Sequence, residues 1–76
     1  MIKLNNNPLL QKIVFNQKIA GGKPILKKSK IQVSEILDYL ATGISLEELL
    51  TFYPKVERDD LIACLQYYLM MNRGIL

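Results

Sequence analysis

Two residues that end helices, Gly43 and Pro54, divide the second half of this 76-residue chain into three segments. Apolar residues recur in each segment at intervals of three and four, which is the spacing of an amphipathic helix. The breaks between the segments leave connections of only a few residues. The pattern therefore predicts three helices packed as a small bundle, covering residues 34–43, 45–53 and about 58–71.

Polar residues at the segment starts match the preferences of helix caps. Ser34 is predicted to cap the first helix at its N-terminus, and Gly43 is predicted to end it in a left-handed conformation. Ser45 and Glu48 have the spacing of a capping box, in which each side chain bonds the other residue's backbone amide. The third helix is expected to end at an exit formed by residues 72–74, and its predicted buried face consists of Leu61, Cys64, Leu65 and Tyr68.

The first half of the chain carries shorter signals. Three asparagines and a proline make residues 1–8 a predicted flexible N-terminus. Residues 9–15 fit a helical turn or a short strand equally well. The Gly21-Gly22 pair permits a turn with positive φ, and residues 23–27 and 30–33 are predicted to form two extended arms around a basic turn.

These elements make up one domain, because a chain of this length supports one small core at most. We expect residues 9–76 to form that domain, with a basic extended or hairpin region at 9–33 and a three-helix bundle at 34–76. The predicted fold class is mainly α: a trihelical, helix-turn-helix-like bundle preceded by a short β-hairpin or an extended basic arm.

Charge is divided sharply along the sequence. Residues 1–34 contain seven lysines and no acid, whereas residues 35–76 contain three bases and seven acids, so the two parts carry +7 and −4. Such asymmetry favours an anionic partner for the first part, either nucleic acid or an acidic protein, over a surface that is merely solvated. The residues predicted to contact DNA are Lys23, Lys27, Lys28, Ser29 and Lys30.

Several functional classes have little support in the composition. Cys64 is alone and the chain has no histidine, so a disulfide within the chain and a His/Cys zinc site are both excluded. Cys64 is predicted to be a small core residue. We expect a protein without enzymatic activity or cofactor, because the acids occupy helix starts and Pro24 follows the Gly21–Lys23 stretch where a phosphate-binding loop would need a helix. No apolar run approaches the roughly 20 residues that cross a bilayer, so a cytoplasmic protein is expected.

The end of the third helix carries more apolar side chains than a small bundle can cover. Tyr67, Met70 and Met71 fall outside the predicted buried face. Exposed aromatic and methionine side chains are typical of subunit contacts. A homodimer formed through these residues is therefore expected.

Short motifs along residues 13–68 resemble a known bacterial family. They are Gly22-Lys23-Pro24, Ile31-Gln32-Val33, Gly43-Ile44-Ser45, Tyr53-Pro54, and Leu65 with Tyr67. In this order they resemble the domain of unknown function four-three-three (DUF433), whose members look like VapB-type antitoxins. One departure is Lys28-Ser29-Lys30, which stands where the family usually has Gly-Thr-Arg and lacks the planar guanidinium.

The resemblance implies a helix-turn-helix-type fold and a role as the antitoxin of a toxin–antitoxin pair. The partner would be a PIN-like nuclease toxin, and the antitoxin would also repress the shared promoter. Such nucleases gather carboxylates around a divalent metal, so an inserted cation would compete with the metal. Arg73 is the first candidate for that cation and Arg58 the second, although Arg73 also suits a helix C-terminus. The alternatives are a DNA-binding regulator acting alone and a small dimerising adaptor.

Overall fold

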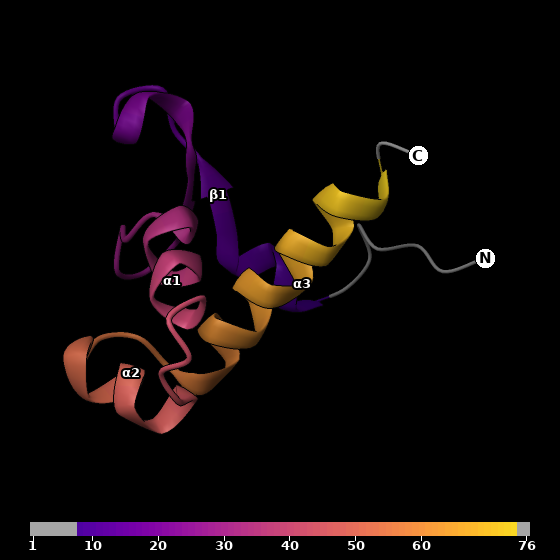
Figure 1. The fold of residues 1–76 in the computed structure, drawn as a ribbon. Helices are drawn as coiled ribbons and strands as arrows, with labels where there is room; N and C mark the ends of the chain where they lie inside the picture. Colours follow the sequence, from indigo (N-terminus) through magenta and orange to yellow (C-terminus); the bar gives the residue numbers. More distant parts are fainter. Residues whose placement is uncertain (1–7, 75–76) are drawn as a thin grey trace.

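The computed structural model describes residues 8–74, and of residues 73 and 74 the backbone only. The fold is a mainly α domain in which a two-stranded antiparallel hairpin precedes three helices, as the sequence predicts (Figure 1). The flexible start predicted for residues 1–8 lies outside the described residues except for Pro8. The elements in chain order are η2 (Pro8–Lys12), β1 (Ile13–Phe15), η3 (Ala20–Gly22), β2 (Pro24–Leu26), α1 (Val33–Leu40), α2 (Leu46–Phe52) and α3 (Arg58–Gly74).

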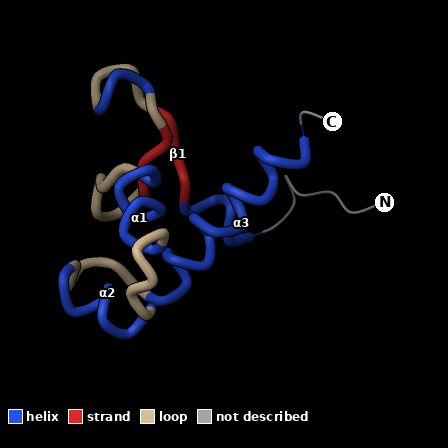
Figure 2. Tube along the Cα trace, viewed as in Figure 1, coloured by secondary structure: helices blue, strands red, loops and turns tan. Residues whose placement is uncertain are grey.

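Strands β1 and β2 form the hairpin, with Ile13 opposite Leu26 and Phe15 opposite Pro24. The chain between them turns through three successive positive φ angles at Ala20 (53°), Gly21 (63°) and Gly22 (85°). A Cβ at position 22 would stand 2.9 Å from the amide end of the exposed Gln17 side chain, which can move aside, so the positive φ is what favours glycine there. The predicted glycine turn is thus the loop that closes this hairpin (Figure 2).

The predicted pairing of residues 23–27 with 30–33 is corrected by the structure. The first arm exists as β2, but its main partner is β1, because residues 9–15 divide into the 3-10 helix η2 and a strand. The second arm is reduced to one bridge between Ile25 and Gln32. It is short because helix α1 already begins at Val33.

The helix caps follow the prediction in part. The Ser45 hydroxyl accepts a hydrogen bond from the Glu48 amide at 3.1 Å, as predicted. Gly43 has the predicted positive φ of 90°, but α1 ends earlier, at Leu40, with the right-handed Ala41 as its C-cap. Ser34, however, lies inside α1, and Gln32 is the residue before the helix. The bridge to Ile25 holds Gln32 in an extended conformation, so the helix starts two residues earlier than a cap at Ser34 would allow.

Helix α3 is longer than predicted and turns a different face to the core. It continues through residues 72–74, and Asn72 donates a hydrogen bond to the Tyr68 carbonyl one turn back. Leu65 and Tyr68 are 37% and 51% exposed, while Tyr67 is half-buried. The reason is that α3 packs against η2 and α1 together, which places Asp60, Leu61, Cys64 and Tyr67 inward at helical spacing.

The core lies where the hairpin, η2 and the three helices meet. Cys64 is fully buried in it, as predicted. Burial raises the pKa of its thiol to about 12, with a smaller contribution from the nearby Asp60 carboxylate. Buried apolar residues come from the hairpin, all three helices and the loop before α3: Ile13, Ile25, Leu26, Val33, Ile36, Leu49, Val56, Leu61, Ala63 and Cys64.

Candidate binding surfaces

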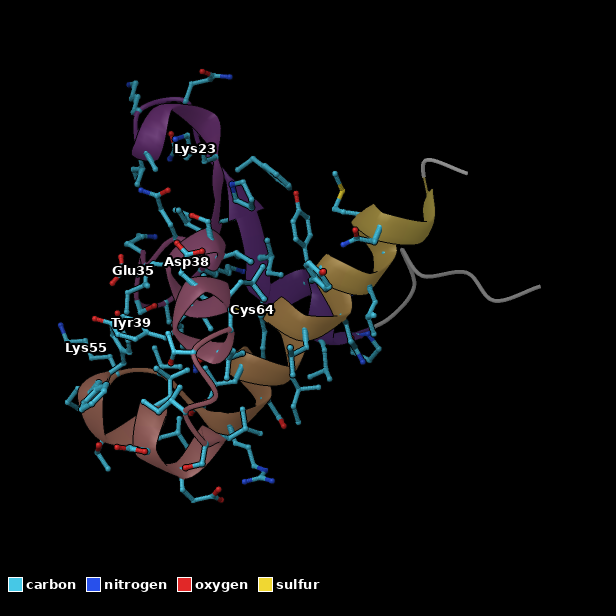
Figure 3. All side chains as sticks on the ribbon, viewed as in Figure 1. Lys23, Glu35, Asp38, Tyr39, Lys55 and Cys64 are labelled. Atoms are coloured by element: carbon cyan, nitrogen blue, oxygen red, sulfur yellow. The ribbon has the colours of Figure 1, made fainter. Side chains whose placement is uncertain are left out.

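The lysines predicted to bind DNA divide into two places. Lys27, Lys28 and Lys30 lie together in and beside the turn after β2, which we call the basic turn (residues 27–30). Lys23 precedes β2 and lies by the hairpin loop instead, as Figure 3 shows. All four side chains are exposed. Among the described residues, no carboxylate lies within 4.0 Å of any of these four lysines.

Backbone hydrogen bonds fix the shape of the basic turn. The Lys30 amide donates to the Leu26 carbonyl at 2.9 Å, and the Lys27 amide donates to the Lys12 carbonyl at 2.7 Å. The Ser29 hydroxyl accepts from the Ile31 amide at 3.3 Å, so this predicted DNA contact is engaged with the turn's own backbone. The turn is therefore tied to both β2 and η2. The Lys30 ammonium donates to the Lys27 carbonyl of the same turn at 2.9 Å, whereas Lys27 and Lys28 are exposed on it.

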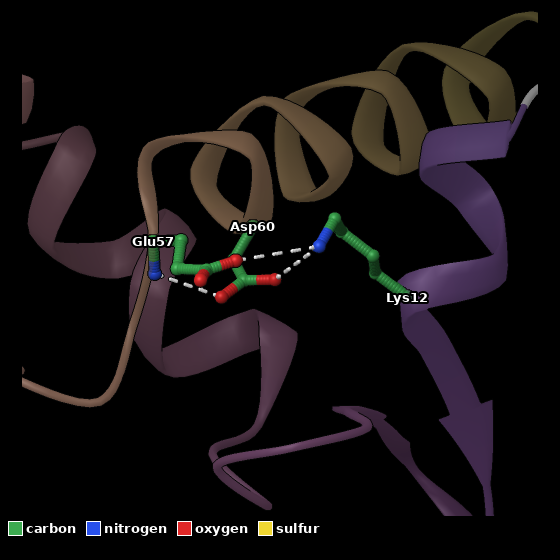
Figure 4. A network of polar contacts seen from close by, with 3 residues as sticks. All are labelled: Lys12, Glu57 and Asp60. Atoms are coloured by element: carbon green, nitrogen blue, oxygen red, sulfur yellow. Dashed lines mark hydrogen bonds and ion pairs between the residues drawn. The ribbon is translucent and has the colours of Figure 1, made fainter.

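A partly buried ion pair beside the basic turn was not predicted from the sequence (Figure 4). Asp60, which is only 4% exposed, receives the Lys12 ammonium at 3.5 Å on one carboxylate oxygen. Its other oxygen accepts a hydrogen bond from the Glu57 amide at 2.8 Å, and the Glu57 carboxylate lies 3.7 Å from the same ammonium. This arrangement caps α3 and ties it to η2.

The spacing of Glu57 and Asp60 is the signal that could have revealed this cap. A carboxylate three residues after the capping position can return to the capping residue's amide, as in the second half of a capping box. Asp59 and Asp60 both lie in the first turn of α3, in agreement with the expectation that the acids occupy helix starts, but the contacts of Asp60 were not predicted. The partner Lys12 is 48 residues away in sequence, and no local pattern identifies it.

The basic turn borders a hollow of about 280 Å³ next to this pair. Lys27 and Lys28 lie on its rim together with Lys12 and Asp60. Since the Lys12 charge is already compensated by Asp60 and Glu57, the cations free to meet an anion here are those of Lys27 and Lys28.

The residues predicted to bind a protein partner are not gathered in one place. Arg58 opens α3 and pairs with Glu47 of α2 at 2.7 Å, whereas Arg73 follows fifteen residues later, about 22 Å along the helix. The side chain of Arg73 lies outside the described residues. Tyr67 is half-buried, and its ring centre lies 6.3 Å from that of Phe15. These two rings and Met70 line a hollow of about 260 Å³. Met71 is exposed.

The exposed face of α3 contains three residues that the sequence pattern had not assigned to a binding surface. Leu65, Tyr68 and Leu69 share one side of the helix, and we call them the outer face of α3. Leu65 and Tyr68 border a hollow of about 300 Å³ that continues onto α1 at Leu37 and Leu40. The sequence did contain a signal for this face: apolar residues occur on both sides of the predicted third helix. A small bundle covers only one of these sides, so the other stays exposed.

Two further observations concern residues 8–74 as a whole. No helix in this part of the chain is both long enough and apolar enough to cross a membrane. Nor do three or more His, Cys, Asp or Glu side chains come together in it as a metal site would need.

Comparison with known proteins identifies the family. The model described as "Protein of unknown function (DUF433)" matches residues 13–68. No curated protein and no solved structure matches the chain. Because the family model covers well over half of the 76 residues, the chain belongs to this family, as the motifs indicate.

Proposed function

We propose that this member of the DUF433 family is the antitoxin of a bacterial toxin–antitoxin pair, which binds and neutralises a PIN-like nuclease toxin. The observation that carries the proposal is the outer face of α3, where Leu65, Tyr68 and Leu69 are each more than a third exposed. Contiguous apolar side chains on the surface of so small a domain indicate a protein partner. The nature of that partner rests on the resemblance of the motifs to antitoxins.

Neutralisation of a nuclease needs a cation that reaches its metal-binding carboxylates. The basic turn supplies three lysines whose charges are uncompensated among the described residues. Arg58 is less available, because its guanidinium is held by Glu47, although an exposed pair of this kind costs under about 1 kcal/mol to open. Arg73 remains the candidate at the other end of α3.

Gentle purification of the tagged full chain from its native host tests this proposal. We expect a small nuclease to co-purify in stoichiometric amount and its toxicity on expression to be suppressed by this protein. Leu69→Asp should lower the recovered nuclease at least tenfold, because it places a charge in the apolar contact. Lys55→Asp, an exposed change in the loop after α2, is the control and should leave recovery unchanged. Recovery of the chain without a nuclease would refute the antitoxin role.

A second role, binding of promoter DNA, is favoured by the basic turn. Lysines contact phosphates as point charges, so the affinity should fall steeply with salt. The start of α3 is a poor alternative, since Glu57 and Asp59 are exposed there and would face the phosphates. We therefore propose that DNA contact, whether by an antitoxin or by a lone regulator, is made by Lys27, Lys28 and Lys30, with Lys23 contributing from the hairpin loop.

Titration of the chain's own promoter DNA at several salt concentrations tests this second role. Lys27→Glu with Lys28→Glu should abolish binding in low salt. Lys18→Glu with Lys55→Glu makes the same change in net charge at exposed positions elsewhere and should weaken binding only modestly. Equal losses for the two double variants would show that net charge alone attracts the DNA.

The adaptor alternative differs in what covers the apolar surface. In it, Tyr67, Met70 and Met71 join two copies of the chain, and no nuclease or DNA is involved. Sedimentation of the purified chain over a range of concentrations separates the cases: a stable homodimer that binds neither DNA nor nuclease would favour the adaptor.

A further inference from the structure

One side of α1 carries a polar and aromatic surface that the proposed function does not use. Asp38 and Tyr39 follow Glu35 by three and four residues, so the three share a side of α1, and Thr42 follows in the turn just after the helix. Glu35, Asp38 and Tyr39 lie along the same flank of α1 in Figure 3. With Gln32 and Ser34 they line a hollow of about 380 Å³, which we call the α1 hollow.

Aromatic rings form a wall beside the α1 hollow. The Tyr39 ring lies 6.1 Å from that of Phe52 and 6.0 Å from that of Tyr53, the second pair meeting edge to face. Tyr39 and Phe52 are nonetheless 41% and 54% exposed. Ring contacts within the cluster thus hold the aromatic side chains in place while much of their surface stays open to a ligand.

The Glu35 carboxylate is oriented by this cluster. The Tyr53 hydroxyl donates a hydrogen bond to one oxygen of Glu35. Partial burial raises the pKa of Tyr53, and the bond to Glu35 raises it further, so the phenol stays protonated and keeps donating. Within residues 8–74, neither Glu35 nor Asp38 forms an ion pair with a lysine or arginine.

We infer that the α1 hollow binds an arginine side chain presented by a segment of a partner protein. A guanidinium can stack on an aromatic face and pair with carboxylates through its planar fork at the same time. Tyr39 offers the exposed ring, and Glu35 and Asp38 offer the two negative charges beside it. A lysine ammonium fits less well, because it is a strongly hydrated point charge without a stacking plane.

The composition of the chain favours another protein over a second copy as the source of this arginine. The chain has only two arginines, and because Arg58 is already paired with Glu47, Arg73 is the one that a second copy would have to present. The exposed cations of its basic turn are all lysines. This inference does not depend on the antitoxin proposal, since it concerns different residues and the opposite charge.

Nuclear magnetic resonance of the ¹⁵N-labelled full chain tests the inference with a defined probe. The probe is the peptide acetyl-Gly-Arg-Gly-Arg-Gly-amide, compared with matched peptides that carry lysine or the uncharged citrulline in place of arginine. We expect the arginine peptide to shift amides in residues 32–42 and 52–53. The lysine peptide should bind at least threefold more weakly, and the citrulline peptide at least tenfold more weakly.

Matched variants show whether the α1 hollow is responsible. Asp38→Asn and Glu35→Gln should each weaken arginine-peptide binding about fivefold, and Asp38→Asn is the safer change because Asp38 is exposed and Glu35 accepts a bond from Tyr53. Glu48→Gln removes one negative charge from an exposed position on α2 and should have no effect.

Three outcomes would overturn the inference. Equal binding of the arginine and citrulline peptides would show that charge plays no role. If Glu48→Gln weakened arginine-peptide binding as much as Asp38→Asn, the attraction would be non-specific. Shifts of the same amides on changing the protein concentration without peptide would show that a second copy occupies the α1 hollow.

Discussion

The charged side chains of the hairpin region and those of the helical bundle differ in what they contact. In the hairpin region, residues 8–33, only Lys12 of the six lysines makes an ion pair with a described residue. In the bundle, residues 34–74, Asp60, Glu57 and Glu47 pair with cations and Glu35 accepts a bond from Tyr53. The bundle therefore uses much of its charge within the fold, whereas most lysines of the hairpin region have no ion-pair partner among the described residues.

The comparison also explains why net charge alone describes this protein poorly. The formal charge of +3 is the sum of +7 on residues 1–34 and −4 on residues 35–76. Removing a bundle acid that has an internal partner should change stability, while removing a lysine of the basic turn should change binding. Asp38 is a bundle acid without an ion-pair partner among the described residues, so removing it should change stability little.

The largest effect on stability is expected at Asp60. Asp60→Ala leaves the Lys12 ammonium without its closest partner and the Glu57 amide without its acceptor. Losing the cap and this partly buried pair should lower the free energy of unfolding by about 2 kcal/mol, because Lys12 is partly exposed and keeps Glu57 nearby. Urea unfolding of the two proteins measures the difference.

Asp59→Asn is the matched control for Asp60, because it changes an exposed acid in the same helical turn. It should alter the free energy of unfolding by less than about 0.5 kcal/mol. Similar losses for the two variants would mean that general helix-end charge, rather than the Lys12 contact, stabilises α3.

A pH-dependent loss of stability is expected from Cys64. Below about pH 8 its thiol is protonated in both the folded and the unfolded chain. Above the ordinary thiol pKa of 9.0 the unfolded chain loses the proton, while the folded chain keeps it up to a pKa of about 12. The free energy of unfolding should therefore fall with rising pH, by up to about 1 kcal/mol per pH unit.

Measurements between pH 8 and 9 separate this effect from that of Tyr53, whose ordinary pKa of 10.0 is also raised in the fold by partial burial and by Glu35, because an unfolded tyrosine is still almost fully protonated there. Cys64→Ala should remove most of the slope in that range. A slope that persists unchanged in Cys64→Ala would assign the pH dependence to other groups.

A smaller effect is expected from the cap of α2. Ser45→Ala removes the acceptor of the Glu48 amide and should cost about 1 kcal/mol. Ser34→Ala should cost less than half as much, because Ser34 lies inside α1 and not at its cap. Thermal unfolding of both variants checks the order, and the reverse order would contradict the observed start of α1.

The smallest effect is expected from the exposed pair of Arg58 and Glu47. Both side chains are more than half exposed, so solvent screens their attraction. Arg58→Ala should change the free energy of unfolding by less than about 0.5 kcal/mol. A loss of more than about 1 kcal/mol in urea unfolding would place Arg58 among the residues that hold the fold.

Local signals in the sequence were enough to predict the three helices, the glycine turn and the burial of Cys64. Each of these depends on residues that are close in sequence, such as Gly43 after α1 or Ser45 before α2. The pairing of β1 with β2 and the contact of Lys12 with Asp60 depend on residues far apart in the chain, and no periodicity specifies them. The buried face of α3 was misassigned for the same reason, since η2 decides whether Tyr67 or Tyr68 turns inward.

The sequence predicted which kinds of residue are candidates for binding better than it predicted where they lie relative to one another. Charge counting identified the lysines of the basic turn, and the structure shows them exposed and held by backbone bonds. It did not separate Lys23 from the others, nor did it find the outer face of α3 or the α1 hollow. These surfaces arise from helix packing, which a single helix pattern does not contain.

One comparison tests the central claim that the lysines of the basic turn serve a partner and not the fold. The tagged wild-type chain and its Lys27→Glu, Lys28→Glu variant are purified from the native host, and each is measured for urea unfolding and for the nuclease that co-purifies. We predict free energies of unfolding within about 0.5 kcal/mol of each other and at least a tenfold loss of nuclease from the variant. The claim would be contradicted if the variant had a clearly lower free energy of unfolding, or if the amount of co-purified nuclease were undiminished.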